Sequence, residues 1–543
     1  MTSHDLPALT APTLCEAFQL TAQAFWDSPG LRTPGNDQAM TYGEWATKVQ
    51  AVAGGLADLG LRRGDTLALM MTNRAEFAVA DMAALHLGAT PFSIYNSSSP
   101  EQIEYLFGNA GNAMVIAERQ FVETIKSANA DVQILVLEDG LPEAGFPEFE
   151  ANWRAVTPET IATLIYTSGT TGPPKGVQLT HANLIASLHA WEEYLQPGGR
   201  LVSYLPLAHI ADRFLHYYWA VGTGSSITFV DNPANLLAGM VDARPTGILC
   251  VPRIWEKFKA ALEAKGITDP SALSDDVKEA IRAQLGLDEA TWAGSGAAPI
   301  APAVLEYFVG LGIPILEGWA MSETACAGIV NPLGGLRVGT VGVPLRTIDM
   351  QIADDGELLV RGPSIMTGYR NAPEKTAEAI DPEGWLHTGD IVTVDADGYV
   401  KIVDRKKELI INAGGKNMSP ANIEQALKAS HPLIGQACCI GDARPYNVAL
   451  LVLDPDASAA YAAAHGLDDA SPAALSQNQD VKALIALAVE EANSHLSRVE
   501  QIKRFTILGE DWLPDSDVLT PTSKLKRRGV NERYAEEIEA LYK

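Results

Sequence analysis

The stretch from Tyr166 to Gly176, YTSGTTGPPKG, concentrates residue types that hold anionic oxygen atoms. Glycines permit backbone conformations closed to other residues, and consecutive amides and hydroxyls in one loop form a concavity that suits a phosphate. The apolar run IATLIYT at 161–167 precedes it, so we expect the loop to leave the end of a buried strand. It is not a G-x-x-x-x-G-K-S/T loop, because Pro174 stands where a second glycine is needed. Alone, the stretch is compatible with a phosphate site and with a polar surface turn.

Two further stretches carry side chains that suit a nucleotide. SYLPLAHIADR at 203–213 places His209 after a proline-containing turn, where a structural histidine and a ligand are about equally expected. ILEGWAMSET at 315–324 runs from an apolar strand to an aromatic ring, hydroxyls and Glu323. A glutamate there is ordinarily a solvated charge, yet this combination could stack on a base and hold a phosphate-bound Mg²⁺ through oxygen.

Two later stretches add a carboxylate and a group of cations. GWLHTGDIV at 384–392 sets Asp390 beside a glycine, where it could accept two ribose hydroxyls or stabilise a turn. LTPTSKLKRRGV at 519–530 carries four basic residues, beginning with Lys524. By itself this run favours a solvated basic segment or a weak nucleic-acid patch.

The composition limits the classes of partner. The chain has 543 residues and a formal net charge of −27 at pH 7, which argues against a binder of nucleic acid or of anionic membranes, since both need a basic footprint. The first Lys or Arg is Arg32, so the charged region of a secretory signal is missing. Asp81 and His86 interrupt the apolar stretch at 77–92, so no membrane span is expected. Five cysteines are expected as buried thiols in a reducing compartment, at positions 15, 250, 326, 438 and 439.

The pattern of apolar residues changes twice along the chain. From about 40 to 330, helical periodicity alternates with short apolar strands, which predicts crossover units and a mostly parallel sheet covered on both faces. The expected strands are TLALMMT, ATPFSIY, AMVIAE, QILVLE, SITFV, TGILCVP and IPILEGWA. From about 335, MQIADDGELLVRG and DIVTVDADGYVKIVDR each place an Asp-Gly turn between alternating strands, which predicts the hairpins of a small antiparallel subdomain, expected as a distorted barrel.

A compact α/β unit is expected after a boundary at 404–407. Ser419 and Pro420 make a good cap and first position for a helix that carries Ile423 and Leu427 on one face. QACCIGD, NVALLVLDPD and KRFTIL predict strands, and the alanine-rich segment at 457–474 predicts a solvated helix without a functional role.

Taken in order, these stretches resemble the adenylate-forming superfamily of acyl-CoA synthetases, non-ribosomal adenylation domains and luciferases. The resemblance extends from MTYGEWATKV at Met40 to LKRRGV at Val530, and LPLAHIADR with DRKKELIINAGGKNMSPANIE is most similar to long-chain fatty acyl-CoA synthetases. It implies an α/β fold with a large N-terminal domain at 1–404, whose mostly parallel sheets are joined by the β-rich subdomain at about 335–404. A small mobile α/β domain at 405–543 would carry the catalytic lysine.

The resemblance also implies a nucleotide site. The loop that would hold the β- and γ-phosphates consists of Thr167, Ser168, Gly169, Thr170, Thr171, Gly172 and Lys175. The residues that would line the adenine slot are Gly296, Ala297, Ala298, Gly318 and Trp319. Ser322 would touch the α-phosphate, and Asp390 with Arg405 would hold the ribose. Thr167 and Glu323 match the family's Mg²⁺ positions.

The remaining implied roles concern catalysis and domain movement. Lys524 is the expected catalytic residue of the first half-reaction, where it would bridge the carboxylate and the α-phosphate oxygens. Lys407 matches the hinge of the C-terminal domain. After rotation about that hinge, the loop facing the pantetheine tunnel would be Gly414, Gly415 and Lys416.

The acyl side is where the sequence departs from the family pattern. His209 lies where the family gates the acyl pocket, and Asp212 nearby would also suit recognition of an amino group. Trp319 replaces the common Tyr and Ser322 the common Thr, which keeps a stacking face and a hydroxyl. Ala320, where Gly is common, borders the expected acyl channel and leaves the length and shape of the acid open.

The expected function is that of an ATP-dependent acyl-CoA ligase for a medium- or long-chain carboxylic acid, with Mg²⁺, ATP and CoA as cofactor and co-substrates. Loading of a carrier protein, an aryl or cyclic acid, and a non-catalytic nucleotide-binding scaffold are the alternatives. The expected partners are small molecules, with no nucleic acid and no transmembrane segment. A cytoplasmic location is expected, with transient membrane contact left open.

Overall fold

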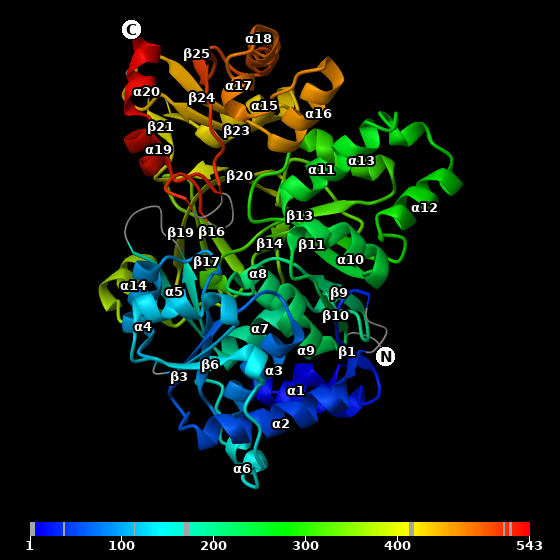
Figure 1. The fold of residues 1–543 in the computed structure, drawn as a ribbon, viewed down its shortest axis with the longest axis vertical. Coiled ribbons are helices and arrows are strands. Elements are labelled where there is room, and N and C mark those ends of the chain that lie inside the picture. Colours follow the sequence, from blue (N-terminus) through cyan, green and yellow to red (C-terminus); the bar gives the residue numbers. More distant parts are fainter. Residues whose placement is uncertain are drawn as a thin grey trace.

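The computed structural model describes residues 6–35, 39–112, 114–167, 173–411, 417–513, 516–520 and 524–543. These residues form a large N-terminal part, drawn from blue to yellow-green in Figure 1, and a smaller C-terminal part, drawn in orange and red above it. Both parts are mixed α/β, as the sequence predicts.

A seven-stranded sheet carries the phosphate-loop stretch at one side. Its order is β18-β8-β7-β4-β3-β5-β6. The strand bounds are β3 (Thr66–Met70), β4 (Thr90–Ser93), β5 (Met114–Ala117), β6 (Gln133–Val136), β7 (Ile161–Thr167), β8 (Lys175–Thr180) and β18 (Gly368–Tyr369). The helices between its first strands are α3 (Ala75–His86), α4 (Pro100–Ala110) and α5 (Val122–Ala128). β3 to β6 are parallel. β3, β4 and β5 are buried throughout, which explains their continuous apolar runs, while β6 at the edge is partly buried. β7 and β8 are antiparallel, and their last pair, Thr167 with Lys175, closes the loop between them.

A second sheet has five strands, and two neighbouring strands of it carry the glycines expected around the nucleotide. Its order is β11 (Gly247–Cys250), β12 (Trp292–Ser295), β13 (Ile315–Trp319), β14 (Ile329–Val330) and β15 (Val343–Pro344). β11, β12 and β13 are parallel, so their carboxyl ends meet at one edge, where ligands of open α/β sheets bind. The helices packed with this sheet include α11 (Pro252–Glu263), α12 (Asp275–Gln284) and α13 (Pro302–Gly310).

A third sheet and a group of helices complete the N-terminal layers. The sheet order is β2 (Met40–Thr41), β1 (Pro29–Arg32), β10 (Ser226–Phe229) and β9 (Arg200–Ser203). The associated helices are α1 (Leu14–Ala24), α2 (Tyr42–Asp58), α6 (Phe149–Arg154), α7 (His181–Ala190), α8 (Ile210–Asp212), the π-helix at Arg213–Tyr218, α9 (Trp219–Thr223) and α10 (Leu236–Ala243). The seven strands expected between residues 40 and 330 are therefore confirmed.

The β-rich segment forms the two predicted hairpins. Its order is β16 (Asp349–Ile352), β17 (Glu357–Arg361), β19 (Leu386–Val394) and β20 (Val400–Arg405), and all three pairings are antiparallel. In this order β16 and β20 do not pair with each other, and Val400 of β20 forms an antiparallel bridge with Gly342, so among the described residues these four strands alone do not close the expected distorted barrel. The β19–β20 register sets Asp390 directly opposite Arg405.

The C-terminal part is a small three-stranded sheet covered by helices. Its strands are β23 (Ile434–Ile440), β24 (Asn447–Leu453) and β25 (Ile502–Ile507). Its helices are α15 (Pro420–Ser430), α16 (Pro455–His465), α17 (Pro472–Leu475), α18 (Gln479–Ser494), α19 (Arg527–Arg533) and α20 (Ala535–Tyr542). The predicted α15 cap is confirmed, because the Ser419 hydroxyl accepts the N–H of Asn422 and Ile423 and Leu427 are fully buried. All five cysteines are buried and unpaired, as expected.

Polar contacts join the two parts. Asp404, at the end of β20, accepts the Ser419 hydroxyl at 2.6 Å and the Ala421 N–H at 3.1 Å, both at the start of α15. The alanine-rich helix α16 is present as predicted, but its first turn meets α11. Arg253 pairs with Asp454, and Lys257 Nζ lies 2.7 Å from the Asp456 carboxylate.

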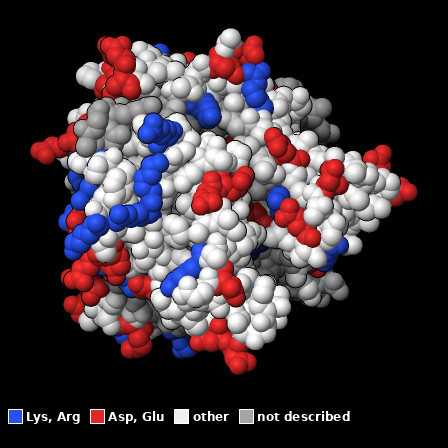
Figure 2. All heavy atoms as spheres, turned by 90° about the horizontal axis from the view of Figure 1, so that it is seen from above, with Lys and Arg blue, Asp and Glu red and all other residues white. Residues whose placement is uncertain are grey.

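Charge is unevenly spread over the molecule. Figure 2 shows acidic side chains scattered over the face seen from above, while lysines and arginines gather along one side of it. Within the described part of the chain, no helix is both long enough and apolar enough to cross a bilayer.

Candidate active site

The β7–β8 hairpin places Lys175 beside a buried tyrosine. The ammonium of Lys175 lies 4.5 Å from the centroid of the Tyr369 ring, on its face. Burial lowers the pKa of Lys175, and the charge of Glu323 acts in the opposite direction. The loop residues Ser168, Gly169, Thr170, Thr171 and Gly172 lie outside the described residues, so the described part of this stretch is its two ends, Thr167 and Lys175.

Glu323 is held in a strained segment. It lies in the 3-10 helix η9 (Ser322–Thr324), and the two residues that follow, Ala325 and Cys326, have φ values of 51° and 65°. Such conformations are costly for residues other than glycine and collect at functional sites. The Glu323 side chain is buried and accepts a hydrogen bond from the Tyr369 hydroxyl at 2.8 Å. The segment therefore fixes one carboxylate beside the phosphate-loop hairpin.

The residues present fit a Mg²⁺ ion shared with a nucleotide. Mg²⁺ prefers oxygen ligands and usually keeps one or two protein carboxylates together with phosphates and water. Glu323 offers one carboxylate and Thr167 one hydroxyl. Among the described residues, no three His, Cys, Asp or Glu side chains gather into a cage. This donor set suits an ion that arrives with a triphosphate.

Asp390 connects the two residues expected around adenine and ribose. Its Oδ2 accepts the Trp319 indole N–H at 2.8 Å, and its Oδ1 lies 2.8 Å from Arg405 Nε. Gly389, at φ 73°, turns the chain so that the Asp390 N–H donates to Thr388 Oγ1. Burial raises the pKa of Asp390, while Arg405 and Trp319 act in the opposite direction. Each carboxylate oxygen keeps a second lone pair, which a ribose hydroxyl could use.

Glycines shape the slot between β12 and β13. A Cβ atom at Gly296 would lie 3.3 Å from the Gly318 carbonyl oxygen, tighter than an ordinary contact. Ala297 follows at φ 67°, another strained position. Ala298 and Ala320 are exposed, as an open edge for a ligand requires.

Lys524 reaches the site from the C-terminal part. Around it, the Lys524 N–H donates to Thr520 Oγ1 at 3.0 Å and Leu519 pairs with Leu525. Lys524 is exposed, yet desolvation by nearby protein atoms, and then the charge of Arg405, lower the pKa of its ammonium. Asp390 and Glu323 act in the opposite direction. The structure thus brings Lys524 within electrostatic reach of residues more than a hundred positions away.

His209 and Asp212 have different surroundings. His209 Nδ1 accepts the Ala211 N–H at 3.2 Å, which leaves the proton of a neutral ring on Nε2. Burial, and then the charge of Lys524, lower the pKa of His209 to about 4. Asp212 is fully buried, and its two oxygens contact four partners: Ser203 Oγ, the Leu205 N–H, His216 Nδ1 and the Asn73 side-chain amide. Asp212 is therefore occupied by the fold, which removes the suggested role in binding an amino group.

Sequence reasoning missed two residues of this site. Tyr369 lies between Lys175 and Glu323, and no local pattern around it signals that position. Glu317 precedes Gly318 on β13 and, by the alternation of a strand, points to the same side as Trp319. Its apolar surroundings raise the pKa of Glu317 to about 7, against an opposing hydrogen bond from Ile300.

The residues expected as the hinge and as the CoA-side loop are described only in part. Lys407 is exposed in the turn that follows β20. Gly414, Gly415 and Lys416 lie outside the described residues.

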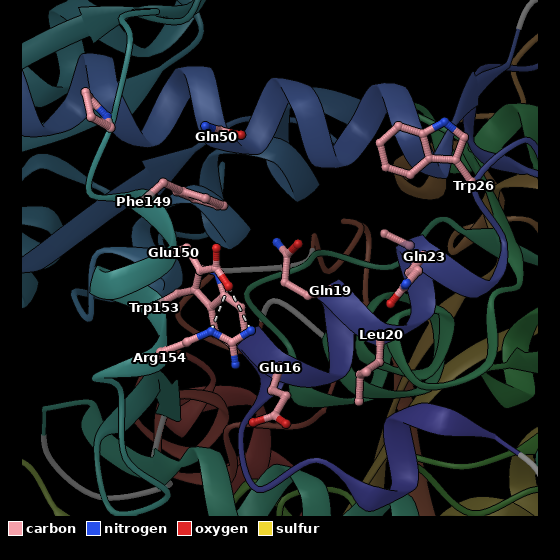
Figure 3. Close-up of a pocket in the computed structure, with 12 residues that line it drawn as sticks. Glu16, Gln19, Leu20, Gln23, Trp26, Gln50, Phe149, Glu150, Trp153 and Arg154 are labelled. Atoms are coloured by element: carbon pink, nitrogen blue, oxygen red, sulfur yellow. Dashed lines mark hydrogen bonds and ion pairs between the residues drawn. The ribbon is translucent and has the colours of Figure 1, made fainter.

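A separate surface hollow of about 740 Å³ lies between α1, α2 and α6 (Figure 3). Gln19, Gln23 and Gln50 share its walls with Trp153 and an Arg154–Glu150 ion pair. None of the motif residues lines it, so its size does not make it the active site.

Comparisons with known proteins agree with this geometry. The AMP-binding enzyme family matches residues 18–370, and the AMP-binding enzyme C-terminal domain matches residues 407–543. Long-chain-fatty-acid–CoA ligase FadD15 of Mycobacterium bovis is 36% identical over 556 positions, covering 93% of this chain and 92% of that protein. The provisionally named fatty-acid–CoA ligase fadD11 of Mycobacterium tuberculosis is 49% identical over 435 positions, covering 73% and 76%.

Solved structures share the fold. The A domain of carboxylic acid reductase from Segniliparus rugosus, in complex with AMP and a co-purified carboxylic acid, has a TM-score of 0.80 at 21% identity, covering 98% of this chain and 94% of that one. O-succinylbenzoate Coenzyme A Synthetase from Bacillus subtilis, in complex with ATP and magnesium ion, has a TM-score of 0.74 at 23% identity, covering 94% and 98%.

Glu317 predicts a pH dependence of stability. Its folded-state pKa of about 7 lies above the ordinary 4.5, so the folded state loses stability relative to the unfolded state as the pH rises between these values. Removing this charge with Glu317→Gln should raise the stability of the variant relative to wild type by up to about 3 kcal/mol on going from pH 5 to pH 8. Thermal unfolding at both pH values measures the difference. The exposed Glu306→Gln on α13 is the control, and an equal pH response in both variants contradicts the expectation.

Proposed function

Because this chain belongs to the AMP-binding enzyme family, we propose that it is an ATP-dependent ligase that joins a medium- or long-chain fatty acid to CoA. The observation that carries the proposal is the position of Lys524 within electrostatic reach of Asp390, Arg405 and Glu323. A lysine from one part of the chain thereby meets the nucleotide-site residues of the other. The relatives named as fatty-acid–CoA ligases supply the substrate class.

The first half-reaction forms an acyl-adenylate. A carboxylate oxygen of the acid attacks the α-phosphorus of ATP, the new P–O bond forms, and the bond to pyrophosphate breaks with its electrons leaving on pyrophosphate. Catalysis of this step depends on positioning and charge stabilisation. Trp319 and Gly318 hold the adenine, Asp390 and Arg405 hold the ribose, and the phosphate loop holds the leaving group.

Lys524 acts where charge develops. Its ammonium bridges the attacking carboxylate and the α-phosphate oxygens, with Ser322 beside them. Thr167 and Glu323 are the residues that would hold Mg²⁺, which when bound neutralises charge on the phosphate oxygens. His209, with its proton on Nε2, lies at the acyl gate on the Lys524 side of the site, and Ala320 borders the acyl channel.

The second half-reaction transfers the acyl group to CoA. The thiol sulfur attacks the acyl carbon, AMP leaves with the bonding electrons, and the thiol proton is released. For this step residues 405–543 would rotate as one domain on residues 1–404, about Lys407, so that Gly414, Gly415 and Lys416 face the thiol. That rotation must break the Arg253–Asp454 and Lys257–Asp456 contacts. The buried thiols suit a reducing compartment, and the proposal includes the cytoplasm.

The direct test is pyrophosphate release from ATP with carboxylic acids of graded length and shape, with and without CoA. We expect a CoA-dependent steady state that is largest for one range of apolar chain lengths. A single stoichiometric burst unaffected by CoA would assign another acceptor, such as a carrier protein. Absence of pyrophosphate release with every acid would leave the nucleotide-binding scaffold as the better description.

Lys524→Ala separates the two half-reactions. Losing one preorganised donor typically costs about 100- to 1000-fold, so pyrophosphate release should fall by that factor. Thioester formation from a supplied acyl-adenylate should change far less, because its chemistry does not need this lysine. Arg528→Ala is the control, since Arg528 is exposed and pairs with Glu532 on α19. Equal losses in both half-reactions of Lys524→Ala would contradict the assignment.

Lys407→Pro tests the hinge. Proline fixes φ, and the described hydrogen bonds of this turn use the N–H groups of Lys406, Glu408 and Leu409, so the change targets rotation more than folding. We expect normal single-turnover pyrophosphate release and impaired CoA-dependent turnover. Lys407→Ala, which keeps φ free, should behave like wild type. Normal thioester formation in the proline variant would refute the hinge role.

A further inference from the structure

We propose that Tyr369 is a positioning residue that holds Lys175 and Glu323 at a fixed separation, ready for phosphate and metal respectively. The inference rests on the proposed function, in which these two residues serve ATP and Mg²⁺. It goes beyond that function by assigning a role to a residue that touches neither reacting atoms nor acid.

Tyr369 contacts both residues with different atoms. Its hydroxyl donates to Glu323 Oε1 at 2.8 Å, while the ammonium of Lys175 lies over its ring face at 4.5 Å from the centroid. The ring is 6% exposed, so neither contact competes with much bulk water. One side chain thus orients a carboxylate through its edge and an ammonium through its face.

The backbone of the same segment reinforces this position. Tyr369 pairs with Val177, two residues after Lys175, and the Arg370 N–H donates to the Gly176 carbonyl at 2.7 Å. On the other side, the Met366 N–H donates to the Glu323 carbonyl at 2.8 Å. The segment therefore lies between the phosphate-loop hairpin and η9 and is bonded to both.

A third element fixes the tyrosine itself. Its N–H donates at 2.9 Å to the hydroxyl of Thr376, in the middle of α14 (Pro373–Ala379). Gly368 has φ 144°, and a Cβ atom there would lie 2.7 Å from Thr376 Cγ2, so glycine is required for this close approach. The tyrosine cannot move without disturbing β18 and α14 together.

The separation of Lys175 from Glu323 keeps both charges available to ligands. An ammonium and a carboxylate that share a buried site attract strongly, and a direct pair would neutralise the two charges that ATP and Mg²⁺ need. Among the ion pairs of the described residues, none joins Lys175 to Glu323. Tyr369 satisfies each of them separately, which leaves the Lys175 charge available to a phosphate and the remaining lone pairs of Glu323 available to a metal.

The two contacts can be removed one at a time. Tyr369→Phe keeps the ring under Lys175 and removes the hydroxyl that orients Glu323. Loss of such an outer partner of a metal ligand typically costs about 10- to 100-fold in metal affinity. Tyr369→Leu removes the ring as well, and loss of a desolvated cation–π contact costs a further factor of about 3 to 30 in the affinity that Lys175 provides.

The experiment is calorimetric titration of the full chain with α,β-methylene ATP, in EDTA and in a series of MgCl₂ concentrations. For Tyr369→Phe we expect unchanged affinity in EDTA and a 10- to 100-fold higher Mg²⁺ concentration for half of the Mg²⁺-dependent gain. For Tyr369→Leu we expect weaker binding in EDTA as well. Tyr307→Phe is the matched control, because its buried hydroxyl donates to the Ile267 carbonyl at 2.7 Å away from the site.

Each other outcome overturns a stated part. If Tyr369→Phe shows the wild-type Mg²⁺ dependence, the hydroxyl does not position Glu323. If both variants lose affinity equally in EDTA and in Mg²⁺, together with melting temperature, the tyrosine is only a structural residue. If the wild-type chain itself fails to bind the analogue with Mg²⁺, the proposed function fails, and the inference fails with it.

Discussion

The geometry of the site depends on the two contacts of the Asp390 carboxylate. It accepts from Trp319 on β13 and from Arg405 at the end of β20, so a single side chain joins the five-stranded sheet to the antiparallel sheet. A buried carboxylate is costly unless donors satisfy it, and these two donors are the residues proposed to flank the nucleotide. The hydrogen bonds that satisfy the buried Asp390 carboxylate therefore also orient the Trp319 ring and the Arg405 guanidinium.

The residues beside the β7–β8 hairpin are also held in place by several elements. Glu323, Tyr369 and Lys175 are held by backbone bonds between β8, β18 and η9, and strained residues follow Glu323. Between these two groups lies Lys524, whose ammonium senses Arg405, Asp390 and Glu323 at once. Charges of both signs therefore act on this lysine, with Arg405 lowering its pKa and Asp390 and Glu323 acting in the opposite direction.

Local features of the sequence predicted many of the helices, strands and turns. They did not predict the contacts between residues that lie far apart in the sequence. The strand before Tyr166, the Asp-Gly hairpins and the Ser419 cap depend on neighbouring residues, and each is present. Tyr369 depends on Glu323, 46 residues before it, and on Lys175, much farther away, so no window of sequence contains the contact. The arrangement of the expected distorted barrel depends on distant residues in the same way, because hairpin turns alone do not specify that Val400 of β20 pairs with Gly342. The role of the alanine-rich helix in meeting α11 was hidden because Asp454 and Asp456 look like ordinary helix-start residues.

Whether residues 405–543 can rotate depends on what the two parts share. Among the described residues, the apolar clusters of the C-terminal part run from Ile410 onward, and those of the N-terminal part end at Ile402, so no hydrophobic core crosses between them. What crosses is polar: the hydrogen bonds of Asp404, the ion pairs Arg253–Asp454 and Lys257–Asp456, and, at the boundary itself, the ion pairs of Arg405 with Asp390 and of Lys406 with Asp355 and Glu357. Lys257–Asp456 is half exposed or more on both sides. Exposed ion pairs contribute at most about 1 kcal/mol each and re-form with water, whereas a shared core would cost far more to separate. A polar seam beside two independent cores is therefore compatible with the proposed rotation, in which Lys524 would enter and leave the site.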